Sequence, residues 1–246
     1  MSGFYRRYLL VLSRFLPFAL AFLRDRRQFI LFGSRRRVAD GTHRQRAERI
    51  RETMLELGPA FIKIGQVLST RPDIVPPIYA DAFRTLQDEV PEGAGEDPKR
   101  VVDEEFGDEL DGSTLEPIAG GSLAYVYTAR YRGERIALKV RRPGLKPLIE
   151  RDLRVVRGLI PLISLFANER QQYSIENAAD DFEEIIADEL DFAREAAIMA
   201  EIRENFVGDD RVVIPNIYET VSSERVLAME YLSVRKITDD DAFDGV

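Results

Sequence analysis

The segment between residues 117 and 144 limits most narrowly what this 246-residue chain can fold into. Residues 123–132 (LAYVYTARYR) alternate small or polar side chains with larger ones, and RIALKVR follows shortly after the Arg132-Gly133 pair. Such alternation is typical of β-strands, and a short glycine-containing connection between two of them is typical of a hairpin. The segment therefore predicts two antiparallel strands that end before Pro143-Gly144.

The sequence on either side of the hairpin predicts mostly helices. Thr42 is a candidate cap for a helix that ends at Gly58-Pro59, and Asp97 is a candidate cap for a helix that starts at Pro98. The other expected helices cover residues 59–69, 77–87, 145–167 and 175–205, and two further strands are expected at 212–220 and 225–232. Residues 91–98 (PEGAGEDP) have the composition of a linker.

This order divides the chain into three regions. Residues 1–41 form a basic and apolar N-terminal arm, residues 42–107 form a helical extension, and residues 108–246 contain the expected strands with long helices between them. The fold class is therefore α+β. Hydrophobic residues make up 45% of the chain, which is enough to bury a core.

The N-terminal arm combines positive charge with apolar side chains. Residues 1–60 hold thirteen arginines and five acids, whereas the whole chain has a net charge of −8. A basic arm suits nucleic acid or anionic lipid, and the apolar run at 15–23 (FLPFALAFL) favours lipid. This run is too short to span a bilayer. Two interpretations remain, an amphipathic helix lying on an anionic membrane through residues 1–37 and a helix buried against the protein's own core.

The composition excludes several kinds of catalytic site. The chain has no cysteine, so disulfides, thiolate metal sites and cysteine nucleophiles are excluded. Its one histidine, His43, leaves almost no material for a histidine metal site or a histidine base. We expect His43 to be a solvated surface residue in an arginine-rich helix, and no metal-ligand set is predicted.

The first candidate site lies at the start of the predicted hairpin, ahead of the second strand, which carries Lys139. Its loop residues are Ala119, Gly120, Gly121, Ser122, Ala124 and Val126. Their spacing to Lys139 matches the protein-kinase glycine-rich loop followed by a strand lysine, with alanine at the first and third glycine positions. Small residues let backbone amides approach phosphates, and Lys139, on the same strand face as Ala137, can contact phosphate oxygens. The alternative is an ordinary β-turn with a surface lysine.

The second candidate site is an acidic stretch within the helix expected at 175–205. Glu189 falls on an apolar stripe at helical spacing, and a buried carboxylate requires a cation, hydrogen-bond donors or a proton. Asp191 and Glu195 are four residues apart, so in a continuous helix they share a face and repel. The three acids therefore suggest a nearby lysine or metal ion, and the alternative is a solvated acidic face.

The third candidate site is the tetrapeptide KIGQ in the helix expected at 59–69. Lys63 and Gln66 share a helix face at a spacing of three residues. Gly65 costs about 1 kcal/mol relative to alanine in a helix interior, which favours a close approach by another backbone or a ligand. The alternative is a plain helix with a packing glycine.

Together these segments resemble the UbiB family of atypical kinase-like proteins, the AarF-domain kinases linked to isoprenoid-quinone biosynthesis. The family's motifs are a K-x-G-Q helix, an alanine-rich nucleotide loop, an A-x-K strand and an E-x-D motif. This chain has KIGQ at 63–66, PIAGGSLAYVY at 117–127, ALKVRRPG at 137–144 and ELDFAREAA at 189–197. The resemblance covers most of residues 45–235. It implies a protein-kinase-like small lobe, in which an antiparallel sheet packs on an αC-like helix, behind a helical extension.

The resemblance also implies roles for individual residues. Lys139 resembles the lysine that contacts ATP phosphates, and Glu195 resembles the helix glutamate that pairs with it. Glu189 and Asp191 match the E-x-D acids, while Lys63, Gly65 and Gln66 match the extension that covers the nucleotide site and limits access by protein substrates. Glu230 and Tyr231 resemble the hinge whose backbone meets adenine.

Two departures from the family pattern affect what the resemblance implies. The loop reads AGGS where the family has alanines, which leaves the nucleotide preference open. The chain also stops at Val246, before a histidine-containing catalytic loop and a D-F-G sequence, so the large lobe is expected to be absent. The Mg²⁺ that accompanies ATP or ADP would then take its ligands mainly from that missing lobe.

The resemblance implies an ATP-binding kinase-like protein or ATPase that supports quinone biosynthesis or membrane-lipid homeostasis. Its expected partners are a nucleotide, an anionic membrane surface and a separate large-lobe chain or quinone-biosynthesis proteins, with no role for nucleic acid. Its expected location is cytoplasmic and peripheral, on the inner face of the cell membrane. The alternative is a catalytically inactive membrane- or partner-binding module produced by a truncated or split gene, so the sequence leaves enzymatic activity undecided.

Overall fold

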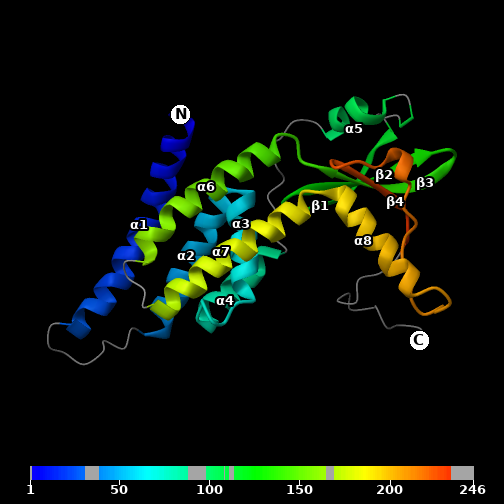
Figure 1. The fold of residues 1–246 in the computed structure, drawn as a ribbon. Coiled ribbons are helices and arrows are strands. Elements are labelled where there is room, and N and C mark those ends of the chain that lie inside the picture. The colour runs from blue at the N-terminus through cyan, green and yellow to red at the C-terminus, as the bar shows by residue number, and fades with distance from the viewer. Residues whose placement is uncertain are drawn as a thin grey trace. The chain divides into compact units, whose positions relative to one another are not determined.

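The computed structural model describes residues 2–30, 39–87, 98–107, 109–110, 114–164 and 169–233. The chain forms two compact units, and Figure 1 shows their elements. The helical unit comprises residues 1–94, 121–123 and 144–187, and the sheet unit comprises residues 95–120, 124–143 and 188–246. The predicted linker, apart from Pro98, and the predicted cap Asp97 lie outside the described residues.

The described part of the helical unit consists of helices. They are α1 (Ser2–Ile30), α2 (Asp40–Leu57), α3 (Pro59–Ser69), α4 (Pro77–Arg84), the 3-10 turn η1 (Thr85–Gln87), α6 (Leu145–Ser164) and α7 (Glu169–Glu189). Gly58 separates α2 from α3 with a φ of 98°, a conformation that glycine adopts without steric cost. The predicted cap at Thr42 is wrong, because its backbone N–H already donates to the carbonyl of Ala39 in the first turn of α2.

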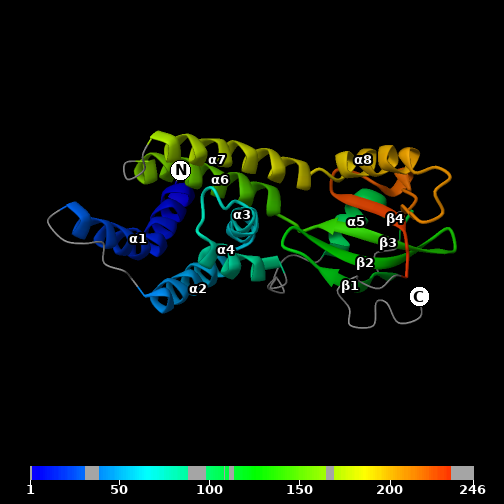
Figure 2. The same cartoon turned by 90° about the horizontal axis from the view of Figure 1, so that it is seen from below.

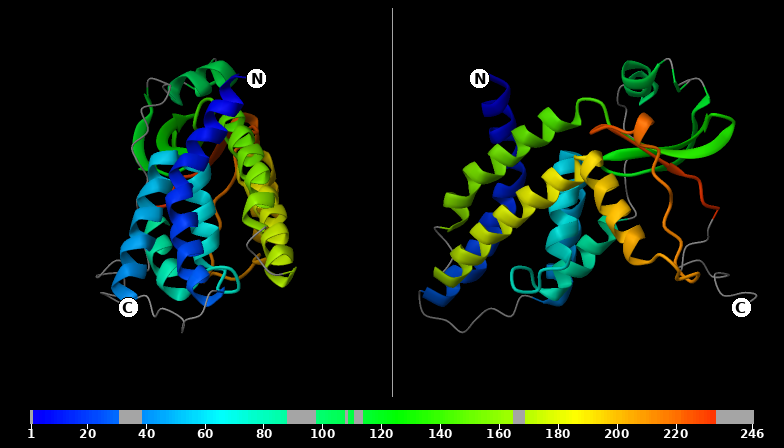
Figure 3. Two further views of the ribbon diagram at one scale, coloured as in Figure 1. Left: turned by 90° about the vertical axis from the view of Figure 1, so that its left-hand side faces the viewer. Right: turned by 45° about the vertical axis from the view of Figure 1, so that its right-hand side comes forward.

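α1 packs on the other helices of this unit through one side. The Arg7 guanidinium donates to both carboxylate oxygens of Asp152 in α6, at 2.8 and 2.7 Å, and to the carbonyl of Leu57. Asp152 is almost fully buried, so this paired geometry compensates for the desolvation of its charge. Phe15 packs near Phe61 of α3, with ring centroids 6.1 Å apart. The left view of Figure 3 shows α1 beside α2 and α6.

His43 differs from its expected solvated state. Its side chain is half-buried, and Nδ1 lies 3.0 Å from the hydroxyl of Tyr79 in α4. Tyr79 is buried, and this burial raises the pKa of its hydroxyl. A long-range contact between α2 and α4, which local sequence cannot reveal, therefore removes His43 from bulk water.

The sheet unit is built on four antiparallel strands in the order β1-β2-β3-β4. They are β1 (Glu116–Gly120), β2 (Ala124–Tyr131), β3 (Glu134–Arg141) and β4 (Val226–Glu230), and Figure 2 shows them in this order. The predicted hairpin is present as β2 and β3. Arg132 and Gly133, the two turn residues, have φ angles of 51° and 89°, as a type I′ hairpin turn requires.

The two faces of this sheet are covered by different helices. On one face, side chains such as Leu138 and Ala228 form a core with Val101 and Val102 of α5 (Pro98–Phe106). On the other face, Ala124 and Leu227 pack against α8 (Phe192–Asn205) through Phe192, Ala196 and Met199. Successive side chains along each strand point to opposite faces of the sheet. Each face therefore carries its own apolar residues and packs on a different helix.

Two expectations for residues 175–232 need correction, and one strand was not expected. The helix expected at 175–205 is interrupted, because α7 ends at Glu189 and α8 starts at Phe192. The expected strand at 212–220 forms only the isolated bridge Ile217–Met229 and the 3-10 turn η3 (Glu219–Val221). Strand β1, which pairs with β2 across a bulge between Pro117 and Ala119, was not predicted.

Gly65 in α3 has a packing reason to lack a side chain. A Cβ at this position would lie 2.3 Å from Leu86 Cδ1 and 2.9 Å from Met54 Sδ, and both of these side chains are buried. The close approach that the sequence suggested at Gly65 is therefore made by neighbouring side chains of the same unit. Gln66 adds a hydrogen bond of 2.8 Å to the carbonyl of Leu86.

We predict that Gly65→Ala destabilises the helical unit by about 1–3 kcal/mol, because the added methyl overpacks the contact with Leu86. Gly41→Ala is the matched control, because a Cβ there meets nothing within 4 Å. Thermal or denaturant unfolding of both variants measures the difference. Equal stability of the two variants would contradict the packing explanation.

Candidate functional site

Lys139 occupies a central position in the sheet. It lies on β3, directly opposite Val126 of β2 and Leu227 of β4. Directly paired residues of antiparallel strands project to the same face. Lys139 therefore shares a face with Val126 and Leu227, and this is the face on which α8 packs.

Glu195 of α8 meets this lysine. The Lys139 Nζ lies 2.8 Å from Glu195 Oε1 and 2.6 Å from Oε2, so both carboxylate oxygens accept from the ammonium. Nζ also lies 4.7 Å from the centroid of the Phe192 ring, which is buried between α8 and the sheet. About a third of each charged side chain is exposed, at 29% for Lys139 and 33% for Glu195. The ammonium is therefore held in place on the protein side and remains accessible from solvent.

The junction between α7 and α8 sets the direction of α8. Asp191 is the N-cap residue, and its Oδ1 accepts from the backbone N–H groups of Ala193 and Arg194 at 3.1 Å each. This contact satisfies two of the free amides at the start of the helix. Asp191 therefore lies outside α8, and the expectation that it shares a helix face with Glu195 and repels it is wrong.

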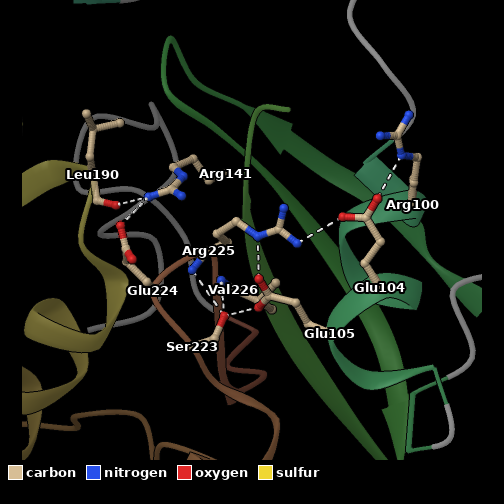
Figure 4. Close-up of polar contacts among 9 residues, drawn as sticks. All are labelled: Arg100, Glu104, Glu105, Arg141, Leu190, Ser223, Glu224, Arg225 and Val226. Carbon is tan, nitrogen blue, oxygen red and sulfur yellow. Dashed lines mark hydrogen bonds and ion pairs between the residues drawn. The ribbon is translucent and has the colours of Figure 1, made fainter. Parts of the chain in front are cut away.

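Arg141 ties this junction to the sheet, as Figure 4 shows. The guanidinium donates to the carbonyl of Leu190 at 2.5 Å and forms an ion pair with Glu224 at 3.3 Å. The backbone N–H of Phe192 donates to the carbonyl of Glu224. Arg141 is buried and lies two residues beyond Lys139, on the same face of β3. Strand β3, which carries Lys139, therefore also holds the start of α8, the helix that carries Glu195.

A second network supports the turn before β4. Arg225 pairs with Glu104 and Glu105 of α5, and Ser223 donates to Glu105 while accepting from the amides of Arg225 and Val226. Figure 4 shows these contacts together with the Arg100–Glu104 pair. Hydrogen bonds from Arg100 and then Arg225 hold the pKa of the Glu104 carboxyl below its usual value. The network joins α5, on one face of the sheet, to the segment that meets α8 on the other face.

The predicted loop residues lie partly on the lysine face. Ala119 pairs with Val126, and Ala124 and Ala137 occupy alternate positions on β2 and β3, so all four share the face of Lys139. Gly120 ends β1, and Gly121 and Ser122 connect it to β2. A Cβ at Gly120 would meet only the Tyr125 ring, at an ordinary contact distance of 3.7 Å. Packing therefore does not require glycine at this position.

The predicted hinge residues follow the buried part of β4. The backbone N–H of Glu230 donates to the carbonyl of Asn216, and the Glu230 carboxylate accepts from the Asn216 amide at 2.8 Å. Tyr231 lies under the Arg135 guanidinium, 4.3 Å from the ring centroid. Glu230 pairs with Ile136, so its side chain belongs to the opposite face from Lys139.

The other predicted site residues lie on other elements. Lys63, Gly65 and Gln66 belong to α3 of the helical unit. Glu189 is the last residue of α7 and is half-buried. Within the described ranges, His, Asp and Glu side chains form no group of three that could hold a metal ion.

Sequence reasoning missed the importance of Arg141. Arg141 and Arg142 are adjacent in the segment ALKVRRPG, and the pair by itself does not indicate which arginine is buried. The period-two alternation from Lys139 places Arg141 on the lysine face, and that signal could have identified it. Its partner, the Leu190 carbonyl, became apparent only through the break between α7 and α8.

The fold and the ion pair define a protein with a kinase-like small lobe, and comparison with known proteins identifies its family. The family described as the ABC1 atypical kinase-like domain matches residues 85–245. The chloroplastic Protein ACTIVITY OF BC1 COMPLEX KINASE 1 of Arabidopsis thaliana is 37% identical over 203 residues, with coverage of 80% of this chain and 30% of that protein. The Probable protein kinase UbiB of Aeromonas hydrophila is 35% identical over 209 residues, with coverage of 81% and 38%. The chain belongs to the ABC1 (UbiB) family of atypical kinase-like proteins.

The chain spans roughly a third of the length of these relatives, 30% and 38% respectively. A structure of Rv3197 with erythromycin from Mycobacterium tuberculosis is similar with a TM-score of 0.46 and 19% identity, and it covers 70% of this chain and 44% of that chain. Among the helices within the described residues, none has the length and apolar character needed to cross a membrane.

We predict that Arg141→Met lowers the free energy of unfolding by about 2–3 kcal/mol, because the buried Leu190 carbonyl loses its charged donor. Arg130→Met, on the exposed part of β2, is the matched control and should change stability by less than about 0.5 kcal/mol. Thermal unfolding measures both effects. Wild-type stability of Arg141→Met would show that the contact does not hold α8.

Proposed function

We propose that the sheet unit binds ATP or ADP with Mg²⁺ as the small lobe of an atypical kinase or ATPase. The observation that carries this proposal is the Lys139–Glu195 pair, in which a strand lysine is held by a helix glutamate and remains partly exposed. A fixed ammonium on a sheet face can contact the α- and β-phosphate oxygens of a nucleotide. The glutamate orients the ammonium, and the Phe192 ring limits its movement on the other side.

The small residues near Lys139 support the same proposal. Ala119, Ala124 and Ala137 lie on the lysine face, and Gly120 lacks a side chain without a packing reason. Small side chains leave room for phosphates to approach backbone amides. In this proposal the backbone at Glu230 and Tyr231 meets the adenine, while Gly121, Ser122 and Val126 complete the surface around the nucleotide.

We predict that the chain binds magnesium-ATP and that Lys139→Met weakens this binding by at least about tenfold, which corresponds to about 1.4 kcal/mol. Glu195→Gln should weaken it less, because the ammonium remains while its orientation is lost. Isothermal titration calorimetry with the chain at millimolar nucleotide measures both effects.

Arg130→Met removes one positive charge from an exposed position of the same sheet and serves as the control. It should bind nucleotide as the wild type does. Equal affinity of Lys139→Met and the wild type for nucleotide would contradict the proposal. So would the absence of nucleotide binding by all of these proteins even when a large lobe is supplied.

The helical extension has a proposed regulatory role. Lys63, Gly65 and Gln66 would limit access of protein substrates to the nucleotide, and Glu189 and Asp191 would act with them. The packing of Gly65 on Leu86 and the bond from Gln66 to the Leu86 carbonyl give these two residues structural roles as well. The predicted division into an arm at 1–41, an extension at 42–107 and a small lobe at 108–246 stays a proposal. It differs from the two compact units, in which α5 belongs to the sheet unit and α6 belongs to the helical unit.

Complete phosphoryl transfer would need further groups. Mg²⁺ would take carboxylate and amide ligands mainly from the large lobe of the kinase-like fold, which would also supply the base. With such a lobe, we propose that the protein supports isoprenoid-quinone biosynthesis or membrane-lipid homeostasis. The names of two relatives, Protein ACTIVITY OF BC1 COMPLEX KINASE 1 and Probable protein kinase UbiB, support this broader proposal.

We further propose that α1 binds peripherally to anionic lipid on the inner face of the cell membrane. The side of α1 that faces away from Arg7 and Phe15 carries an exposed apolar row, which consists of Tyr5, Leu9, Leu16 and Leu20. Exposed Arg6 and Arg24 flank this row. Exposed apolar residues with flanking arginines suit the interface of an anionic bilayer. The same row favours the alternative function, an inactive membrane- or partner-binding module.

We predict that Leu9→Glu combined with Leu16→Glu abolishes sedimentation with vesicles that contain an anionic phospholipid, because two charges replace exposed apolar contacts. Leu162→Glu, at an exposed apolar position of α6, is the control and should sediment as the wild type does. Binding of the wild type should also weaken at high salt. Unchanged sedimentation of the double variant would rule out this surface of α1 as the membrane contact.

A further inference from the structure

Asn216 joins the last residue of β4 to the last turn of α8. The backbone N–H of Glu230 donates to the Asn216 carbonyl at 2.8 Å, and Glu230 Oε2 accepts from the Asn216 backbone N–H at 3.2 Å and from Nδ2 at 2.8 Å. The side-chain oxygen Oδ1 of Asn216 accepts from the Arg203 guanidinium. The amide thus turns its oxygen toward a cation and its nitrogen toward a carboxylate. These three residues are here called the Asn216 clamp.

The Asn216 clamp lies where the chain leaves the sheet. Next to it, Ile217 forms a bridge with Met229, and the Tyr218 N–H donates to the carbonyl of Ala228 at 3.0 Å. Residues 216–218 therefore run beside the last three residues of β4. The ends of secondary structure elements fray most easily, so contacts at the last residue of a strand decide how well its backbone is fixed.

The clamp holds Glu230 from the face of the sheet opposite Lys139. Glu230 pairs with Ile136, which places its side chain on that opposite face. The lysine face of the hinge therefore remains available to a ligand. A base that is recognised by backbone groups needs those groups in fixed directions, because a hydrogen bond weakens steeply when its donor and acceptor are misaligned. The clamp can fix them without occupying the nucleotide side.

The clamp is better suited to ligand recognition than to folding. Arg203 and Asn216 are exposed, and exposed polar contacts contribute little to stability. Recognition is more sensitive, because a small displacement of a binding group can remove most of its effect. The two roles therefore predict different consequences of the same substitution.

We infer that Asn216 is a positioning residue that gives the proposed site its affinity for a nucleobase, as distinct from phosphate alone. Lys139 would bind phosphates whatever group they are attached to, whereas the hinge backbone would recognise the base. Arg203 holds the Asn216 amide, so the helix that carries Glu195 also supports the base-binding part of the site. This inference rests on the proposed nucleotide function, because it assigns a residue to one part of that site.

The test compares magnesium-ATP with magnesium tripolyphosphate, which share a triphosphate but differ in the presence of a base. Isothermal titration calorimetry on Asn216→Ala should show at least about fivefold weaker binding of ATP and less than about twofold change for tripolyphosphate. Lys139→Met should weaken both ligands. Asn205→Ala, at the exposed end of α8, is the matched control and should leave both affinities unchanged. Wild-type affinity of Asn216→Ala for ATP would overturn the inference.

A charge exchange tests whether the contact with Glu230 is direct. Asn216→Asp places a second carboxylate beside Glu230 and should weaken ATP binding at least as much as alanine does. Adding Glu230→Gln reverses the hydrogen bond, because glutamine can donate to the new aspartate. The double variant should recover ATP affinity to within about twofold of the wild type. Failure of the double variant to recover ATP binding would contradict the role of this contact.

Thermal unfolding separates positioning from folding. Asn216→Ala should lower the melting temperature by less than about 2 °C. A larger decrease together with equal weakening of both ligands would assign Asn216 to folding and overturn the inference. If the wild type binds ATP no more tightly than tripolyphosphate, base recognition fails while phosphate binding stands. If the wild type binds neither ligand, the proposed nucleotide function itself is contradicted.

Discussion

The pairing of Lys139 with Glu195 holds the lysine ammonium on a partly exposed region of the sheet face. A lysine has a flexible stem, so a partner on a separate element is needed to hold its charge in one place. Glu195 provides both carboxylate oxygens, and the buried Phe192 ring lies on another side of the same nitrogen. The apolar contacts of Phe192, Ala196 and Met199 with the sheet place α8 where Glu195 reaches the ammonium.

The break between α7 and α8 is what makes this pairing possible. A continuous helix through residues 190 and 191 would not free the Leu190 carbonyl for Arg141 or the Asp191 side chain for the first amides of α8. Each of these contacts satisfies a backbone group that helix ends leave unpaired. Asp191 therefore acts as the N-cap of α8. Its negative charge also stabilises the helix, because it lies at the positive end of the helix dipole.

The helical unit shows how a motif can have a structural explanation beside a functional one. Gly65 and Gln66 of KIGQ both contact Leu86, one through the absence of a Cβ and the other through a hydrogen bond. α1 likewise has two distinct sides, with Arg7 fixed on buried Asp152 and Leu9 exposed. The packed side of α1 agrees with the interpretation of a helix buried against the protein's own core, whereas membrane binding by the exposed side stays a proposal.

The sequence by itself determined the elements that depend on neighbouring residues. The β2–β3 hairpin follows from alternation and from a turn that tolerates positive φ at Arg132 and Gly133, and α3 follows from its flanking prolines and periodicity. Family motifs also indicated the Lys139–Glu195 pair. Only the tertiary structure decided that residues 212–220 lack a strand, that α8 starts at Phe192 and that Arg141 is the buried arginine of its pair. These features depend on hydrogen bonds between residues tens of positions apart, such as Arg141 and Leu190, and local propensity contains no information about such partners.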